Sequence, residues 1–330
     1  MPPTVILLPG DTGLMDHTYV KTRREGRVLI ATLDSPPHQL MTFDLVAELD
    51  QLVAEVERDE SVGAVVLHGA HPERFLAHFD VSELLESGRA SRVRLSHGQA
   101  SLALHAVSAA ARIPGGAALV DRTPATGMLG LERFHDLMLR IGRVGVTFIA
   151  AIDGSSLGGG CELSLACDLR FMADGDFVIG QPEILLGIIP GGGGSQRLTR
   201  LVGTGKAIEL VLEGTALDPG EALEIGLVHR VVAPERLLDE AIETAQRLAR
   251  RPRVAVAAAK RAVYEGGSMD LPSGLHVERA AFMQTLTSAA AERGMQAYVD
   301  GFAATGELPA YDLPAREALL DGSYVDLTQD

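Results

Sequence analysis

The sequence predicts an α/β fold, because short apolar runs of strand length alternate with longer segments of helical periodicity. Residues 62–68 (VGAVVLH) and 146–152 (VTFIAAI) are apolar runs typical of buried strands, whereas residues 45–57 repeat apolar side chains at helical spacing. Glycine-rich turns join several of these segments. With 330 residues, 46% of them hydrophobic, the chain can bury a substantial core.

The amino-terminal half is predicted to begin with a β-hairpin at residues 18–33, where two β-prone runs flank Arg24-Glu25-Gly26. A helix at 45–57 and a strand at 62–68 follow, and a further strand is expected at 146–152. A helix should begin at the glycines after that strand, and the next strand should cover 168–173.

The last third of the chain is predicted to be mainly helical. A helix from residue 221 closes on a glycine and returns to one strand, and the expected helices after it are 234–250, 253–265 and 275–301. Residues 304–330 are interpreted as a tail with one short helix near Ala315. The predicted parts are an extension at 1–16, an α/β core at 17–252 with an insertion at about 87–130, and a helical region at 253–330.

The charge of the chain limits its partners. Its formal net charge is −15, from 29 basic and 44 acidic residues that are scattered along the chain. Nucleic acid is therefore not expected as a partner. An anionic small molecule would have to be held by backbone N–H groups, helix ends and a few local cations.

The lengths of the apolar runs bear on the localisation of the protein, and the spacing of its two cysteines bears on metal binding. The apolar runs are too short for a membrane span, and the amino end lacks the pattern of a secretory signal. Cys161 and Cys167 lie six positions apart, which places them on different sides of a helix and does not match the spacing of a zinc site. A reduced, cytoplasmic protein without a metal is expected.

The glycine-rich stretch at 154–168 has three possible interpretations: a phosphate site, a packing device or part of an active site. A dinucleotide fingerprint starting at Gly158 would require a small residue where the chain has Leu163. Small residues can also simply let a helix approach a strand. Glycines at a helix start can instead present N–H groups to a carbonyl oxygen, with Glu162 in the first helical turn.

A second glutamate, Glu183, follows in the segment 180–190 (GQPEILLGIIP). Two glutamates in apolar surroundings would have their pKa values pushed apart, which gives one proton donor and one proton acceptor. Alternatively, Glu183 is an ordinary acid at a helix start after a proline.

Together these motifs resemble the enoyl-CoA hydratase/isomerase (crotonase) superfamily. The similar segments are 152–163 (IDGSSLGGGCEL), 166–171 (ACDLRF) and 180–198 (GQPEILLGIIPGGGGSQRL), and weaker similarity extends to 33–41 and 292–298. The resemblance implies a spiral of ββα turns, a helical carboxyl region that forms homotrimers or homohexamers, and an acyl-CoA substrate. It implies no metal and no cofactor apart from the coenzyme A of the substrate.

The resemblance also implies the site residues. The backbone N–H groups of Phe79 and Gly159 would form the oxyanion hole, and Glu162 and Glu183 would be the catalytic acids of a 2-enoyl-CoA hydratase. Glu183 would donate a proton to Cα, and Glu162 would orient and deprotonate the water. The positions that would bind substrate are Gln39, Met41, Ala77, His78, Asp80 and Gly158.

The chain departs from the family pattern at His78, Phe79 and Ser82, where small residues or a lysine are usual. His78 could be a third catalytic group or a histidine that only packs in its loop. The insertion at 87–130 either remodels the acyl pocket or elaborates the surface. The alternatives to hydration are isomerisation, thioester hydrolysis or decarboxylation of an acyl-CoA, or a binding subunit without turnover.

Overall fold

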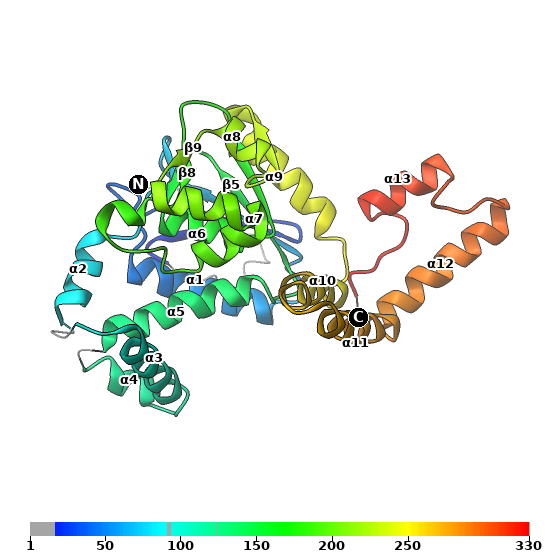
Figure 1. The fold of residues 1–330 in the computed structure, drawn as a ribbon. Coiled ribbons are helices and arrows are strands. Elements are labelled where there is room, and N and C mark those ends of the chain that lie inside the picture. The colour runs from blue at the N-terminus through cyan, green and yellow to red at the C-terminus, as the bar shows by residue number, and fades with distance from the viewer. Residues whose placement is uncertain (1–16, 91–93, 124, 330) are drawn as a thin grey trace, which may run out of the picture.

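The computed structural model describes residues 17–90, 94–123 and 125–329, so the predicted extension at 1–16 lies outside the described residues. Two sheets form the centre of the molecule (Figure 1). The larger sheet has the order β1 (Val20–Glu25), β2 (Val28–Leu33), β3 (Ala64–Gly69), β5 (Thr147–Ile152), β7 (Leu169–Ala173) and β10 (Arg230–Val232). The smaller sheet has the order β4 (Arg74–Leu76), β6 (Ser155–Leu157), β8 (Ile179–Gly180) and β9 (Ala216–Leu217).

The chain winds as a spiral in which each turn adds one strand to the larger sheet, the next strand to the smaller sheet, and then a helix. The turn made by β5, β6 and α6 (Gly159–Ala166) is followed by one made by β7, β8 and α7 (Gly194–Glu213). Strands β2, β3, β5, β7 and β10 are parallel, and β1 pairs with β2 as the predicted antiparallel hairpin. The predicted α/β class is confirmed.

Both faces of the larger sheet are covered by apolar layers. Successive residues of a strand point to opposite faces, so each strand contributes side chains to both layers. Val28 and Ile30 of β2 pack in the layer beneath α9 (Pro234–Leu248), and Leu29 and Leu33 pack in the layer that contains α1 (Phe43–Arg58). Helix α1 begins at Phe43, two residues before the predicted start, because the Thr42 side chain caps the helix by accepting a hydrogen bond from the Leu45 N–H.

The region of the predicted insertion is helical. After α2 (Val81–Ala90) come α3 (His97–Ala111), α4 (Gly116–Val120) and α5 (Thr126–Ile141). The run of small residues at 99–111 predicts a helix there, and α3 matches it, whereas α2, α4 and α5 were not predicted. Val107, Val120 and Leu129 form a small apolar core of their own, which joins α3 and α4 to the first turn of α5.

The last third of the chain is a series of helices: α8 (Pro219–Glu224), α9, α10 (Arg253–Lys260), a π-helical turn (Arg261–Glu265), a 3-10 turn (Gly266–Ser268), α11 (Leu271–Leu286), α12 (Ala289–Thr305) and α13 (Leu313–Asp321). Helix α9 packs on the larger sheet, whereas α12 and α13 extend away from the sheets (Figure 1). The prediction of one helix at 275–301 is wrong. Ser288 ends it, because its side chain accepts a hydrogen bond from the Ala291 N–H and starts a new helix.

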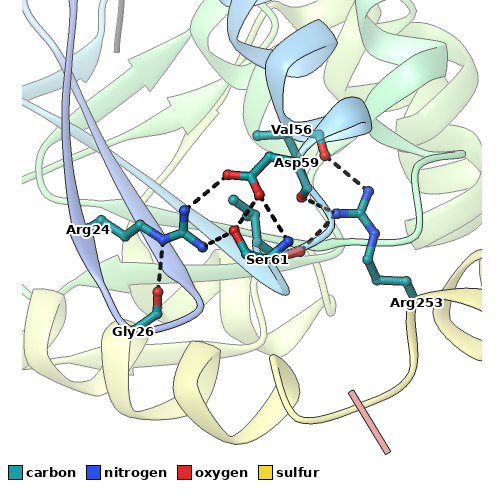
Figure 2. A network of polar contacts seen from close by, with 7 residues as sticks. Arg24, Gly26, Val56, Asp59, Ser61 and Arg253 are labelled. Carbon is teal, nitrogen blue, oxygen red and sulfur yellow. Dashed lines mark hydrogen bonds and ion pairs between the residues drawn. The ribbon is translucent and has the colours of Figure 1, made fainter. Parts of the chain in front are cut away.

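A polar network fixes the start of this helical region (Figure 2). The Arg253 guanidinium donates to the carbonyl oxygens of Val56 at 3.0 Å and Asp59 at 2.6 Å, at the end of α1. These carbonyls have no partner inside a helix that ends there. Arg24 of the hairpin donates to the Asp59 carboxylate at 3.0 Å and to the Ser61 hydroxyl at 2.6 Å. The network joins the hairpin, α1 and α10.

A buried ion pair makes a second junction. Lys260 of α10 lies 2.7 Å from the Asp168 carboxylate and donates to the carbonyl oxygens of Ile141 at 2.9 Å and Val146 at 2.7 Å. The Tyr264 hydroxyl donates to the other Asp168 oxygen at 2.9 Å. Burial lowers the pKa of Lys260, and the charge of Asp168 opposes this shift.

We expect Lys260→Met to lower the free energy of unfolding by about 3–5 kcal/mol, because it leaves the Asp168 charge buried without its partner. Urea unfolding measures the change. Lys206→Met is the matched control, because Lys206 pairs with Glu209 at 3.0 Å on the exposed surface of α7, and loss of such a pair costs about 0–1 kcal/mol. Equal losses in the two variants would contradict a special role for the buried pair.

Candidate active site

The glycine-rich stretch forms a tight turn between β6 and α6, where three segments meet. Gly158 has φ 48° and ψ −120°, a conformation that residues with a side chain rarely adopt. A Cβ atom at Gly158 would lie 3.0 Å from Glu183 Oε1 and 3.3 Å from His78 Cβ. The bare backbone therefore lets Glu183 and His78 approach the same point.

Gly159, the first residue of α6, lies against the loop after β4. A Cβ atom at Gly159 would lie 3.4 Å from the Phe79 backbone nitrogen and 3.2 Å from Met41 Sδ. The backbones of Gly159 and Phe79, which were predicted to form an oxyanion hole, are thus neighbours.

The amides around this pair are engaged, which fixes the backbone. The Leu157 N–H donates to the Ala77 carbonyl at 3.0 Å, the Gly158 N–H to the Gly180 carbonyl at 2.9 Å, and the Asp80 N–H to the Met41 carbonyl at 2.8 Å. Within the described part of the chain, the N–H groups of Phe79 and Gly159 donate to no protein acceptor. Two neighbouring amides therefore remain available to an oxygen atom of a ligand.

Glu162 lies in the first turn of α6, as predicted, and is only 3% exposed. Its Oε1 accepts hydrogen bonds from the backbone N–H groups of Gly192 at 2.6 Å and Gly194 at 2.8 Å. Arg197 holds this loop by donating to the Gly192 carbonyl at 3.2 Å. The pKa of Glu162 is raised to about 7. Burial is the main cause, the charge of Glu183 acts in the same direction, and the two N–H groups oppose the shift.

Glu183 begins a 3-10 turn (Glu183–Leu186) after Pro182. The side-chain amide of the buried Gln181 faces the Glu183 carboxylate, and in the amide orientation that satisfies both groups its nitrogen donates to the two carboxylate oxygens, at 2.9 and 3.2 Å. Burial raises the pKa of Glu183, while a charge on His78 lowers it. Gln181 was not predicted as a site residue, although its position two residues before Glu183 was a usable signal.

The remaining predicted residues surround this point in different ways. Met41 is fully buried beside Gly159, and the Asp80 carboxylate accepts a hydrogen bond from the Ser82 N–H at 2.8 Å at the start of α2. His78 is exposed, and its Nδ1 lies 2.9 Å from the Phe79 carbonyl oxygen. The Gln39 amide bonds to backbone atoms of its own loop and of β4, so its side chain is engaged inside the protein.

A concave pocket of about 400 Å³ lies against the two segments that lead to Phe79 and Gly159. It is lined by His38, Leu40, Arg74, Ala77, His78, Ser155 and Leu157. In the described ranges, no group of three or more histidine, cysteine or acidic side chains is arranged to hold a metal ion. None of the described helices combines the length and apolar character that a membrane span requires.

Comparison with known proteins identifies the family. The family model described as enoyl-CoA hydratase/isomerase matches residues 119–304, more than half of the chain. The chain belongs to the enoyl-CoA hydratase/isomerase family. The predicted resemblance to the crotonase superfamily is thereby confirmed.

Similar curated family members include the short-chain-enoyl-CoA hydratase of Clostridium acetobutylicum, which is 33% identical over 87% of this chain and 96% of its own. A probable enoyl-CoA hydratase of Rhizobium meliloti is 35% identical over 86% of this chain and 96% of its own. Among solved structures, the enoyl-CoA hydratase of Geobacillus kaustophilus superposes with a TM-score of 0.72 at 26% identity, over 87% of this chain and 96% of that one. The ββα spiral is thus the family fold.

The raised pKa of Glu162 predicts a stability that depends on pH. Between its ordinary value of 4.5 and about 7, the folded state holds a proton that the unfolded state has released. The contribution of Glu162 to stability is therefore present below this window and is lost as the pH rises through it.

We expect the free energy of unfolding of Glu162→Gln, measured relative to that of the wild type, to rise by about 3 kcal/mol as the pH is raised from 4.5 to 8. Urea unfolding at intervals across this range measures the difference. Glu209→Gln, at an exposed position on α7, should stay parallel to the wild type at every pH. A Glu162→Gln curve that is also parallel would refute the raised pKa.

Proposed function

We propose that the protein is a 2-enoyl-CoA hydratase, which adds water across the C2=C3 bond of an unsaturated acyl-CoA. The observation that carries this proposal is the position of two acids, the buried Glu162 and the partly buried Glu183, near the amides of Phe79 and Gly159, which donate to no acceptor among the described residues. The hydratase names of relatives that are 33–35% identical over most of the chain support it.

In this proposal the two amides stabilise the oxyanion. The thioester oxygen accepts hydrogen bonds from the N–H groups of Phe79 and Gly159, and it gains negative charge as water attacks Cβ. Loss of one such donor typically costs about 3–4 kcal/mol of transition-state stabilisation. Backbone donors also suit this acidic chain, because they hold an oxyanion without an added cation.

The two acids move the protons. A water molecule bonds to Cβ and gives a proton to Glu162, and Cα receives a proton from Glu183. The charge of Glu183 raises the pKa of Glu162, so the pair favours a state with one proton. The proposed reaction requires this proton on Glu183, and the N–H groups of Gly192 and Gly194 stabilise the charged form of Glu162 that accepts the proton of water. The loop N–H groups of Gly192 and Gly194 orient Glu162, and Gln181 orients Glu183.

The substrate would enter through the 400 Å³ pocket. We place the thiol arm of coenzyme A along Ala77, His78 and Leu157, which immediately precede the two amide donors. Arg74 lines the same pocket and can meet an anionic group. In this role coenzyme A is part of the substrate, and no further cofactor is proposed.

The setting we propose is cytoplasmic, since Cys161 and Cys167 are buried free thiols. We also propose a homotrimer, or a homohexamer made of two trimers. Large apolar side chains are exposed on one subunit along the loop after Glu183 and on the helical region, notably Leu185, Ile189, Leu271, Phe282 and Leu313. Such a surface is typical of a subunit interface.

We expect Glu162→Gln and Glu183→Gln each to lower kcat/KM for crotonyl-CoA hydration by about 10²–10⁴-fold, because each removes one proton-transfer group. Loss of the absorbance of the conjugated thioester follows the reaction. Glu209→Gln is the control and should retain full activity. Circular dichroism of each variant shows whether the fold is intact.

Three other outcomes would replace the proposal. Migration of the double bond without gain of water would indicate an isomerase, and release of free coenzyme A would indicate a hydrolase. Tight binding of the ester without any turnover would indicate a binding subunit. Full activity of both glutamine variants would refute the assignment of the acids.

We expect native mass spectrometry to give three or six copies of the 34.9-kDa chain. Phe282→Asp, on the exposed face of α11, should shift the protein toward monomers because it places a charge in the apolar interface. Glu278→Asp on the same helix conserves the charge and is the control. A monomeric wild type would rule out the trimer.

A further inference from the structure

Three phenylalanine rings lie in contact at the end of the candidate site. Phe43 begins α1, Phe79 carries one of the two amide donors, and Phe134 lies on α5. The ring centroids of Phe43 and Phe79 are 5.0 Å apart, those of Phe79 and Phe134 are 5.8 Å apart, and both pairs meet edge to face. We call these three residues the aromatic cluster.

The aromatic cluster reaches the proposed catalytic acid. A Cβ atom at Gly192 would lie 2.1 Å from the Phe134 Cε1 atom and 2.7 Å from Glu162 Oε2. The ring and the carboxylate therefore flank one glycine. Phe134 is only 3% exposed, so its ring occupies space inside the protein beside Glu162.

The direction of the acyl chain follows from the other side of the site. The open pocket is lined by Ala77, His78 and Leu157, which precede the amide donors, so the coenzyme side of the thioester lies there. A thioester carbonyl held at the donors directs its acyl chain away from that pocket. The chain then passes Glu162 and meets the rings of Phe79 and Phe134.

The predicted insertion fixes the position of Phe134. Leu129 on α5 packs with Val107 and Val120 in the small core of α3 and α4. One residue later, Gly130 gives room to Phe43, whose Cε1 would lie 2.4 Å from a Cβ atom at that position. Phe134 is one helical turn beyond Gly130 and points to the same side of α5. The ring is therefore positioned by α5 and by its contact with Phe79, and the insertion packs on the first turn of the same helix.

We propose that the aromatic cluster closes the acyl pocket and restricts the protein to short enoyl thioesters. This inference rests on the proposed hydratase function. The insertion acts through α5 in this proposal: it holds Phe134 in the path of a longer chain. Phe134 is thus a specificity residue that touches the substrate's acyl end, and it takes no part in proton transfer.

The test compares kcat/KM for crotonyl-CoA and 2-decenoyl-CoA in the wild type, Phe134→Ala and Phe134→Leu. We expect the wild type to prefer crotonyl-CoA by at least about 100-fold, and Phe134→Ala to raise the ratio of decenoyl to crotonyl activity by about 10-fold or more. Phe134→Leu keeps most of the packing and should give a smaller rise. Phe171→Leu, in the core layer beneath α9, is the control and should leave the ratio unchanged.

The outcomes separate this inference from the proposed function. A wild type that hydrates both esters equally well, or a ratio that neither Phe134 variant changes, would overturn the specificity role and leave the hydratase proposal standing. A wild type that hydrates neither ester would overturn the hydratase proposal. In that case, binding of butyryl-CoA and decanoyl-CoA is measured by calorimetry, and equal affinities would overturn the closed pocket as well. If Phe134→Ala does not fold, Phe134→Leu decides the result.

Discussion

The close approach of three chain segments at Gly158 and Gly159 is the constraint on which the site depends. Without side chains at these positions, the loop after β4 and the turn that carries Glu183 reach the start of α6. The same approach leaves the amides of Phe79 and Gly159 adjacent, with no acceptor for either in the described ranges of the chain. Backbone donors without an acceptor must be kept in place by their neighbours, and the backbone hydrogen bonds of the adjacent residues do this.

The two glutamates show how the fold sets chemistry. Glu162 is buried, yet its carboxylate receives two backbone N–H groups from a loop 30 residues further along the chain. Burial and hydrogen bonding oppose one another there, and burial dominates, so the pKa of Glu162 rises to about 7. Burial also raises the pKa of Glu183, and the Gln181 amide faces the Glu183 carboxylate. Proton transfer near neutral pH is the chemistry that this balance favours.

The parts of the chain outside the spiral are tied to it at a few polar or apolar junctions. Arg253 and Lys260 attach the helical region through backbone carbonyls and Asp168, whereas the small core around Leu129 attaches α3 and α4 to α5. Phe134 lies further along α5, where its ring and the Glu162 carboxylate flank Gly192. In the proposed specificity role, the insertion acts on the acyl end of the site through this helix.

The sequence by itself determined the α/β class, the hairpin, the start of α6 at the glycines and the family, because these follow from local periodicity and long motifs. It also pointed to Glu162 and Glu183, whose roles remain a proposal. It did not predict α5 or the break at Ser288, since a run of helical residues does not reveal which neighbours it will pack against. Tertiary structure alone brought Phe134 and the N–H groups of Gly192 and Gly194 to Glu162, because the proximity of residues far apart in sequence depends on how distant segments pack.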